Sequence, residues 1–369
     1  MNPPGGWLDP LPWAACCEQA DADSVRFALN SPQPGLREFA RLLSPAADAE
    51  LEAMATRAQA ITRRHFGRVI SLYVPLYLSN YCSGGCVYCG FAADREQPRR
   101  RLEPDELEIE CRALKERGFE DVLLLTGERC PQADVDYLRE SVRAAARHFH
   151  NVTVETFAMT TDEYRSLAAA GCTGVTLYQE TYDPALYSRL HRWGPKRDFR
   201  FRLEAPERAL EAGMRTVGIG ALLGLDEPRR EAIALLQHAW HLRRRFWRAG
   251  VLISFPRLCG AQGHYQPPCP VGDRLLAQII FAFRIVLPDV PLVLSTREAP
   301  AFRDGVAGVG ISRMSAASRT TVGGYHDPTR AEAGQFDVSD TRDAETFCGA
   351  LRAKGLEPVF KNWEAVYRG

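Results

Sequence analysis

Three closely spaced cysteines are the strongest candidates for chemistry in this chain. Cys82, Cys86 and Cys89 occur in the segment CSGGCVYC, which directly follows a β-rich run. Thiolates at this spacing can converge on one soft metal centre, such as zinc, copper(I) or an iron–sulfur cluster. A structural zinc site normally has four protein ligands, and no partner CxxC or HxxxH pair accompanies this loop. A four-iron cluster on three cysteines leaves one iron open, as a catalytic cluster requires, and three free thiols are the alternative.

The remaining cysteines show no spacing typical of metal ligands. Cys111 and Cys172 fall in helix or helix-end segments and are expected to be small core residues. Cys130 follows a strand-end motif, and we expect it to be incidental. An odd total of 11 cysteines does not indicate a disulfide framework, so a reducing cytoplasm fits the composition. The others are Cys16, Cys17, Cys259, Cys269 and Cys348.

Composition excludes several classes of protein. Lysine plus arginine and aspartate plus glutamate both number 46, so no overall field favours nucleic acid or an anionic membrane. The run Arg99–Arg101 is local and is expected to lie in a solvated loop. No segment approaches the roughly 20 apolar residues that span a bilayer. The first residues, MNPPGGWLDPLPW, do not resemble a secretory signal, and we expect a cytoplasmic protein.

Alternating strands and helices must position the cysteine loop. A helix is predicted over residues 44–66, because Ser44 can act as a cap and Pro45 suits the first helical position. Eight short apolar strands follow, mostly separated by helix-length segments, which predicts a (β/α)8 TIM-type barrel (residues 67–369) behind an N-terminal helical extension (residues 1–66). A doubly wound open sheet remains the alternative, because periodicity cannot show closure. The strands are expected at residues 69–80, 121–125, 152–157, 174–179, 216–222, 250–256, 291–295 and 309–312.

Polar and glycine residues gather at the ends of these strands, where chemistry is expected in such folds. Thr126, Gly127 and Glu128 end the second strand, where a glycine permits close approach and a carboxylate suits an ammonium group. Glu180, after the fourth strand, is placed to accept hydrogen bonds from hydroxyls, and a surface carboxylate is the alternative. The fifth strand enters a glycine-rich turn around Gly220, but no Lys-Ser/Thr pair follows as in a phosphate-binding loop.

The C-x3-C-x2-C spacing, with Tyr88 before the last cysteine, resembles the signature of the radical S-adenosylmethionine (SAM) superfamily. The resemblance implies a TIM-type barrel, a [4Fe–4S] cluster and SAM, which is cleaved to a 5′-deoxyadenosyl radical. It also implies that Glu128 holds the methionyl amine in a GGE-type motif. Glu180 would then contact the ribose, and the strand around Gly220 the adenine.

The resemblance extends to one family within that superfamily. YVPLYLSNYCSGGCVYCGF, LLLTGE, VTLYQETYDPALY, RLEAPERALEAG, VGIGALLGL, SFPRL, LSTREAPAFRD and GGYHDP match in order the 2-iminoacetate synthase family, the tyrosine lyases of thiamine thiazole synthesis. The match includes the SPAA helix and the C-terminal GLEPVFKNWEAV. It implies cleavage of the Cα–Cβ bond of L-tyrosine to 2-iminoacetate and p-cresol. It also implies thiazole synthase as a partner and a flavodoxin- or ferredoxin-type reductant.

Candidate substrate residues follow from the chemistry of an amino acid. A carboxylate is gripped better by a planar arginine fork than by lysine. Arg297, with Ser295, is predicted to hold it, and Arg257 to lie nearby; an ion pair between Arg297 and a neighbouring carboxylate is the alternative. Four unranked residues could line the phenol end of the substrate: Tyr77, Tyr178, Tyr182 and His326.

Several other functions share these features. The tyrosine lyase that matures the hydrogenase cofactor carries a second cysteine triad in a C-terminal extension, and only Cys348 follows Cys269 here. A tryptophan lyase or a deazaflavin-cofactor synthase subunit would share the superfamily signature. An iron–sulfur electron carrier usually supplies four cysteines per cluster. A zinc-binding interaction module lacks a complete ligand set.

Overall fold

A closed barrel of parallel strands forms the body of the protein. The computed structural model describes residues 6–258, 265–327 and 334–361. In that part the strand order is β2-β3-β4-β5-β6-β7-β8-β1, and β1 also pairs with β2, so the sheet closes. This confirms the TIM-type barrel and excludes the open sheet. The barrel strands are β1 (Val69–Tyr77), β2 (Asp121–Leu125), β3 (Asn151–Glu155), β4 (Gly174–Thr176), β5 (Thr216–Gly220), β6 (Gly250–Ser254), β7 (Leu292–Leu294) and β8 (Arg313–Ser315).

The eighth strand lies later in the chain than residues 309–312, so that prediction was wrong. The preceding segment forms a tight turn instead, in which Gly308 adopts φ +70° and its N–H donates to the carbonyl of Ile311. A positive φ favours glycine, which explains the break before β8. A further strand that the sequence did not predict, β9 (Glu357–Val359), pairs with the first half of β1.

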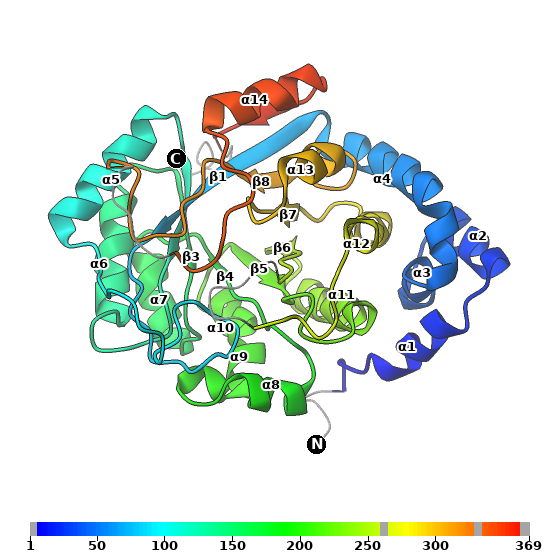
Figure 1. Cartoon of the computed structure of the whole chain (residues 1–369), viewed down its shortest axis with the longest axis horizontal. Helices are drawn as coiled ribbons and strands as arrows, with labels where there is room; N and C mark the ends of the chain where they lie inside the picture. The colour runs from blue at the N-terminus through cyan, green and yellow to red at the C-terminus, as the bar shows by residue number, and fades with distance from the viewer. Residues whose placement is uncertain (1–5, 259–264, 328–333, 362–369) are drawn as a thin grey trace.

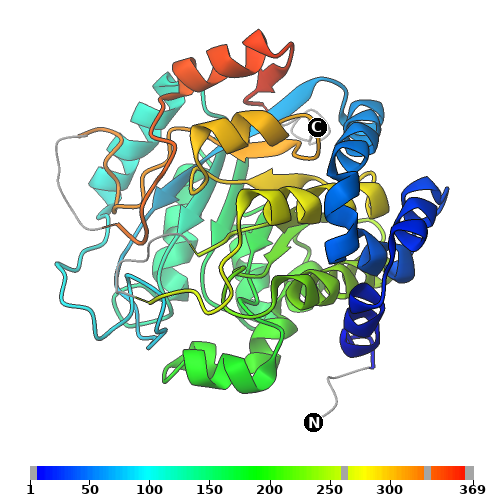
Figure 2. The ribbon, with the colours of Figure 1, turned by 45° about the vertical axis from the view of Figure 1, so that its right-hand side comes forward.

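Helices surround the barrel and pack against its outer face (Figures 1 and 2). Aspartate or threonine caps begin several of them, such as Asp134 before α6 and Thr160 before α7, as expected at helix N-termini. None of the helices in the described ranges combines the length and apolarity needed to cross a membrane. They are α5 (Pro104–Glu116), α6 (Val135–Ala145), α7 (Thr161–Ala169), α8 (Pro184–Leu190), the 3-10 helix η2 (Pro195–Arg197), α9 (Phe199–Leu203), α10 (Ala205–Glu211), α11 (Pro228–Arg245), α12 (Asp273–Val286), α13 (Pro300–Val306) and α14 (Ala344–Ala353).

The N-terminal helices lie along one side of the barrel, beside α11 and α12 (Figure 1). The helix predicted over residues 44–66 is present as a 3-10 turn, η1 (Pro45–Glu50), followed by α4 (Leu51–Phe66). Before it the chain forms α1 (Leu11–Glu18), α2 (Ala22–Asn30) and α3 (Leu36–Leu42). The amide of Gln237 on α11 exchanges hydrogen bonds with the main chain of Asp9, and Gln278 on α12 donates to Leu42 and Ser44 carbonyls. These buried amide contacts fasten the extension to the barrel.

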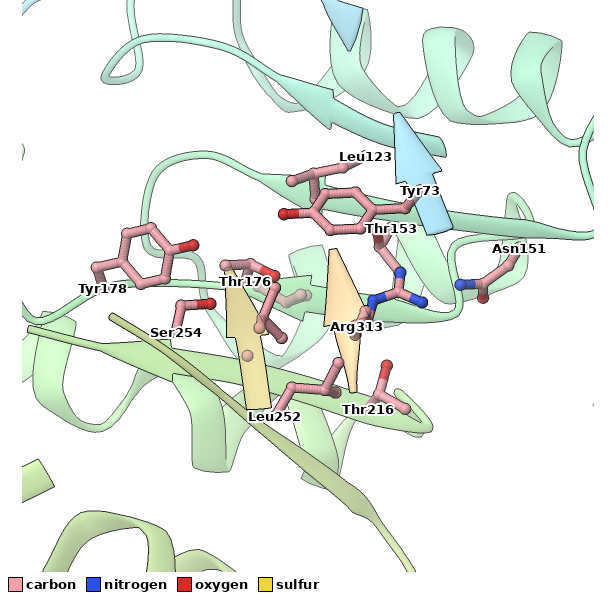
Figure 3. A pocket seen from close by; sticks show the side chains of 13 residues that line it. Tyr73, Leu123, Asn151, Thr153, Thr176, Tyr178, Thr216, Leu252, Ser254 and Arg313 are labelled. Atoms are coloured by element: carbon pink, nitrogen blue, oxygen red, sulfur yellow. The ribbon is translucent and has the colours of Figure 1, made fainter. Parts of the chain in front are cut away.

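Polar side chains line much of the barrel interior. A cavity of about 70 Å³ is bordered by the hydroxyls of Tyr73, Thr153, Tyr178 and Ser254 and, at the amino ends of the strands, by Arg313 (Figure 3). This volume has room for about two water molecules, because water occupies ~30 Å³ in the liquid. Side chains alternate along a strand. A residue two positions later in the chain than a cavity-lining residue therefore also points into the barrel, closer to the carboxyl end of its strand.

Candidate active site

The cysteine loop leaves the carboxyl end of β1 and folds over the mouth of the barrel. A Cβ atom placed on Gly84 would lie 3.7 Å from the sulfurs of both Cys82 and Cys86, so the two sulfurs flank one glycine. Cys82 and Cys89 also pack against apolar side chains inside the barrel, among them Tyr77. The fold thus brings the loop with all three predicted cysteines to the barrel mouth, and the absence of a side chain at Gly84 leaves space between the first two.

The donor set around the sulfurs fits an iron–sulfur cluster. The main-chain N–H groups of Gly84 and Glu128 point at the Cys82 sulfur at 3.4 and 3.2 Å, and the Gln335 amide nitrogen lies 3.8 Å from the Cys89 sulfur. Hydrogen bonds to cysteine sulfur tune such clusters. No group of three His, Cys, Asp or Glu side chains in the described ranges converges on a single metal ion. A four-iron cluster does not require that convergence, since each cysteine binds a different iron.

Burial favours the protonated form of Cys82 and Cys86 when no metal is bound. It raises the pKa of Cys82 to about 11, and the pKa of Cys86 is also raised, with Lys196 acting in the opposite direction. Metal binding requires the thiolate form and releases the protons. All ten cysteines that the structure describes are free thiols, as expected for a chain without a disulfide framework, and Cys259 lies outside the described residues.

Arg99 fixes the cysteine loop from within. Its guanidinium donates to the main-chain carbonyls of Asn80, Phe91 and Ala92 at 2.6–2.9 Å. Arg101 instead lies at the surface beside Glu103. The expectation of a solvated arginine run is therefore wrong for Arg99. Among the described residues the loop has no neighbouring strand to pair with, so its main-chain carbonyls accept hydrogen bonds from the Arg99 side chain instead.

Gly127 is required by packing against the cysteine loop. A Cβ atom there would lie 2.4 Å from the Tyr81 carbonyl oxygen and 2.7 Å from Cys82 Cβ. The next residue, Glu128, is buried and faces Gly84, with its Cβ 3.5 Å from the position of a Gly84 Cβ. Thr126 hydrogen-bonds to Thr156 on the neighbouring strand end. The predicted TGE motif therefore lies against the cysteines, with Glu128 Cβ beside Gly84 and its carboxylate accepting from the Arg129 main-chain N–H at 3.1 Å.

Glu180 occupies a strained backbone position at the mouth. Its φ is +71°, which is rare for a residue with a side chain. Its carboxylate accepts a hydrogen bond from Lys196 at 2.6 Å and lies 3.6 Å from Arg202. Arg202 is buried and the Lys196 side chain is 13% exposed. Burial lowers the pKa of Lys196, but its neighbours, the Glu180 carboxylate among them, raise it overall above its usual value. Glu180 is therefore a buried and doubly paired carboxylate rather than a surface one.

Gly220 and Tyr88, two further residues predicted to contact the cofactor, also lie at the barrel mouth. A Cβ atom on Gly220 would lie 2.8 Å from the Tyr178 ring and 2.9 Å from the Ser254 carbonyl, so only glycine fits. The Tyr88 hydroxyl is buried and lies 2.7 Å from Nε2 of His191. Burial lowers the pKa of His191 to about 2, so this imidazole is neutral. The geometry gives Tyr88 a role in fixing the cysteine loop through that hydrogen bond.

Glu231 on α11 holds the turn that carries Glu180. Its carboxylate accepts hydrogen bonds from the Thr181 hydroxyl at 2.6 Å and from the Tyr182 N–H at 2.9 Å. Burial raises the pKa of Glu231 to about 8, with both hydrogen bonds acting in the opposite direction. The positive φ at Glu180 is thus maintained from a neighbouring helix, which no local motif indicated.

We expect Glu231→Ala to destabilise the protein by about 1–3 kcal/mol, because it leaves buried donors unsatisfied. It should also raise the KM for SAM several-fold with a smaller effect on kcat, and Glu231→Gln should restore both, since the amide oxygen can still accept. Thermal unfolding and steady-state kinetics would measure these effects. An unchanged KM for SAM in a folded Glu231→Ala protein would show that the turn does not depend on this contact.

Arg297, at the carboxyl end of β7, forms no ion pair with a carboxylate among the described residues. It stacks on the Phe336 ring at 3.5 Å, and its buried Nε has no hydrogen-bond partner among the described residues. No ion pair joins it to a described carboxylate, so the expected alternative is not observed there. The Ser295 hydroxyl lies beside it and accepts from the Arg297 main-chain N–H at 3.4 Å. This arrangement suits an incoming carboxylate.

Arg257 is already paired. It contacts Glu298 at 2.5 Å and Asp273 at 2.6 Å, and donates to the Val271 carbonyl. Its guanidinium is therefore committed to carboxylates of the protein. Its predicted place near the substrate stays a prediction, and the structure gives it a role in holding the segment that contains Arg297.

The four candidates for the phenol end separate into two groups. Tyr178 lines the barrel cavity, and Tyr77 lies inside the barrel with its hydroxyl donating to Gln335 at 2.7 Å. Tyr182 turns away, with its hydroxyl 2.8 Å from His238 on α11. His326 is exposed and its main chain donates to Glu110 on α5. Only the first two face the interior.

Glu155, at the end of β3, is a candidate site residue that the sequence did not single out. Thr153 lines the cavity, so Glu155 two positions later faces the same interior. Burial raises its pKa to about 7, Glu180 adds to this effect, and Arg297 opposes it. Its position as the last residue of a barrel strand was the available signal, because catalytic groups gather at that end of such barrels. A carboxyl group that titrates near neutral pH can exchange a proton with a substrate.

Comparison with known proteins agrees with this architecture. Residues 76–239 match the family model described as the radical SAM superfamily, and residues 254–357 match the biotin and thiamin synthesis associated domain. The chain is 41% identical over 345 residues to 2-iminoacetate synthase of Escherichia coli (strain K12), covering 93% of this chain and 91% of that protein. The 2-iminoacetate synthase of Salmonella typhimurium is 40% identical over the same length.

Solved structures give the same result for the fold. The crystal structure of HydG, a maturase of the [FeFe]-hydrogenase, superimposes with a TM-score of 0.91 at 31% identity, covering 97% of this chain and 80% of HydG. Methylornithine synthase (PylB) superimposes with a TM-score of 0.71 at 21% identity over 91% of this chain, which supports the fold alone.

The barrel and its cysteine loop define a radical SAM enzyme, which uses a [4Fe–4S] cluster and SAM. Within that superfamily, the chain belongs to the 2-iminoacetate synthase family.

Proposed function

We propose that this protein is a tyrosine lyase that cleaves the Cα–Cβ bond of L-tyrosine to 2-iminoacetate and p-cresol, and so supplies the thiazole of thiamine. Its family relatives carry that synthase name. The observation that carries the proposal is that the cysteine loop and Arg297, which has no ion pair with a described residue, lie at the same barrel mouth. A cysteine loop alone supports the superfamily, whereas an arginine that lacks an anion supports an amino-acid substrate.

Cys82, Cys86 and Cys89 are the proposed ligands of the cluster. Bound together, the cluster and SAM supply hydrogen-atom abstraction. The buried Glu128, whose Cβ packs beside Gly84 of the cysteine loop, is proposed to accept a hydrogen bond from the methionyl ammonium with its carboxylate. Glu180 is held by Lys196 and Arg202 in the orientation proposed for the ribose contact. The main chain around Gly220 is proposed to contact the adenine, since the Tyr178 ring and the Ser254 carbonyl occupy the space that a side chain at Gly220 would take.

L-Tyrosine binds above the cavity, because about 70 Å³ does not accommodate its side chain. Arg297 and Ser295 hold the carboxylate by charge-assisted hydrogen bonds. Glu155 accepts a hydrogen bond from one of the two proton-bearing groups of the substrate, the ammonium or the phenol. Tyr77 and Tyr178 border the space available for the ring.

The proposed reaction requires two protein partners, one that supplies electrons and one that receives the imine product. Each cluster reduction consumes an electron, which a flavodoxin- or ferredoxin-type protein would deliver in a reducing cytoplasm. The imine product hydrolyses in water, so a closed barrel that excludes solvent protects it before its transfer to thiazole synthase.

Glu155→Gln is expected to change the pH dependence of both activity and stability. The carboxyl titrates with a pKa of about 7 in the folded protein and near its usual value of about 4.5 when unfolded. Its stabilising contribution is therefore complete below pH 4.5 and lost as the pH rises to 7, because the folded state holds the proton longer. Above pH 7 the amide variant should be more stable than the parent by about 1–3 kcal/mol.

For the parent we expect kcat/KM for tyrosine to rise through pH 7 as Glu155 ionises, and the variant should lose this rise. Rate profiles and thermal unfolding from pH 5 to 9 would measure both effects. A Gln variant with the parental profile in both would remove Glu155 from the site.

Parallel anaerobic assays with tyrosine and with tryptophan test the proposed function. Reconstituted protein with reductant and SAM should form p-cresol and 5′-deoxyadenosine with tyrosine, and no cleavage product with tryptophan. Cleavage of tryptophan instead would assign the enzyme to another cofactor pathway.

A further inference from the structure

An exposed tryptophan covers the outer side of the cysteine loop. Trp193 packs so closely on Gly85 that a Cβ atom there would lie 2.4 Å from its ring, and Gly85 donates its N–H to the Trp193 carbonyl at 3.1 Å. Gly85 directly precedes Cys86. The Trp193 side chain nevertheless stays 40% exposed. An aromatic ring at the surface is thus separated from a proposed cluster ligand by a single glycine.

The chain around this tryptophan is basic. Residues 189–197, RLHRWGPKR, hold four cationic side chains and no carboxylate, in a chain whose overall charge is zero. Lys196 is paired inside with Glu180, and Arg192 pairs with Asp94 at 2.7 Å. Arg189 and Arg197 are exposed and form no ion pair with a described residue. Two free positive charges therefore lie within four residues of Trp193 on either side.

An electron-donor protein can approach the cysteine loop from only one of its two sides. The inner side faces the barrel, where Cys82 and Cys89 pack against Tyr77 and where Glu128 and Glu180 are proposed to bind SAM. Access from the barrel is therefore occupied during the reaction. Electron transfer between proteins becomes much slower with distance, so a donor must approach by the outer side, at Trp193.

We infer that Trp193, Arg189 and Arg197 form the docking surface for an acidic one-electron carrier protein that reduces the cluster. An exposed aromatic ring supplies the anchor typical of interface hot spots. Unpaired arginines around it attract a negatively charged partner and raise the association rate. The inference rests on the proposed function, since only a cluster that is reduced in each turnover needs such a donor.

The double variant Arg189→Glu/Arg197→Glu tests this surface. A matched control exists at the amino end of the barrel, where the exposed Trp247 lies under Arg248, and Arg244 is also exposed without an ion pair to a described residue. Arg244→Glu/Arg248→Glu makes the same change in net charge beside an exposed tryptophan. Neither pair contacts the proposed cofactor or substrate groups.

Binding of an oxidised flavodoxin, measured by titration calorimetry at low salt, is the first readout. Charge reversal at residues 189 and 197 should raise the Kd by about tenfold or more, as loss of complementary charge does at protein interfaces, while the control stays within about twofold. Added salt should remove most of the difference. An unchanged Kd, or an equal rise in both variants, would overturn the inference.

Turnover with two reductants separates this inference from the proposed function. With flavodoxin as donor, the 189/197 variant should need a higher flavodoxin concentration for half-maximal rate; with dithionite, it should match the parent. A parent enzyme that cleaves no tyrosine with dithionite would contradict the proposed function, while the flavodoxin Kd would still decide the docking surface. A 189/197 variant that is equally slow with dithionite would assign these arginines a structural role and overturn the inference.

Discussion

Cys86→Ala is expected to abolish both the cluster and the formation of 5′-deoxyadenosine. The variant leaves two of the three proposed ligands, and the reaction has no route without the cofactor chemistry, so activity should fall by at least about 10³-fold. Iron content, the charge-transfer absorbance of the reconstituted protein and its EPR spectrum with SAM would measure the loss. The fold should persist, because the loop lies over the barrel and contributes little to its main core.

Cys172→Ala is the matched control for this experiment. Cys172 is a buried free thiol behind the barrel wall, where its sulfur contacts the Gly174 carbonyl at 3.3 Å. Its replacement should cost about 1 kcal/mol of stability and leave the iron content unchanged. A Cys86→Ala protein with full iron and normal deoxyadenosine formation would contradict the assignment of the ligands.

Arg297→Ala is expected to reduce kcat/KM for tyrosine by about 10²–10³-fold. Truncating one partner of a buried charge pair costs about 2–5 kcal/mol, and each 1.36 kcal/mol corresponds to a factor of ten. The effect should be specific to the substrate, since Arg297 contacts Phe336 and Ser295 and none of the proposed SAM residues. Binding of SAM, followed by its effect on the EPR spectrum of the cluster, should be unchanged.

Two further variants, Arg297→Lys and Arg257→Lys, test whether the effect comes from the substrate carboxylate. Arg297→Lys keeps the charge but loses the planar fork, so it should recover only part of the loss. Arg257→Lys weakens the pairs with Glu298 and Asp273 and should act mainly on thermal stability. Tyrosine KM and turnover that remain at parental values in folded Arg297→Ala and Arg297→Lys proteins would refute the carboxylate assignment.

The barrel was predictable because its strands are short apolar runs with helix-length spacers. The sequence placed β2 over the same residues that the structure does, and placed the starts of β1, β4, β5 and β6. It failed at β8, where Val309–Ser312 reads as a strand but the positive φ of Gly308 places those residues in a turn. It also missed β9, whose three residues become a strand only by pairing with β1.

Some residues of the candidate site could be recognised from short sequence motifs, whereas others could be recognised only from the three-dimensional fold. Cys82, Cys86, Cys89 and Glu128 belong to short motifs at strand ends, so their types and spacing sufficed to single them out. Lys196, Arg202 and Glu231 come from helices and turns that approach Glu180 only in the fold. No local pattern encodes such contacts, and only the three-dimensional structure identifies these residues as partners of the site.

The most direct test of the central claim follows the carbon–carbon bond itself. L-Tyrosine labelled with ¹³C at both Cα and Cβ would be incubated anaerobically with reconstituted enzyme, SAM and reductant, and the products analysed by mass spectrometry. Tyrosine lyase chemistry separates the labels, with the Cα label in glyoxylate from hydrolysed 2-iminoacetate and the Cβ label in the methyl group of p-cresol. Formation of 5′-deoxyadenosine with both labels retained in one product would contradict it.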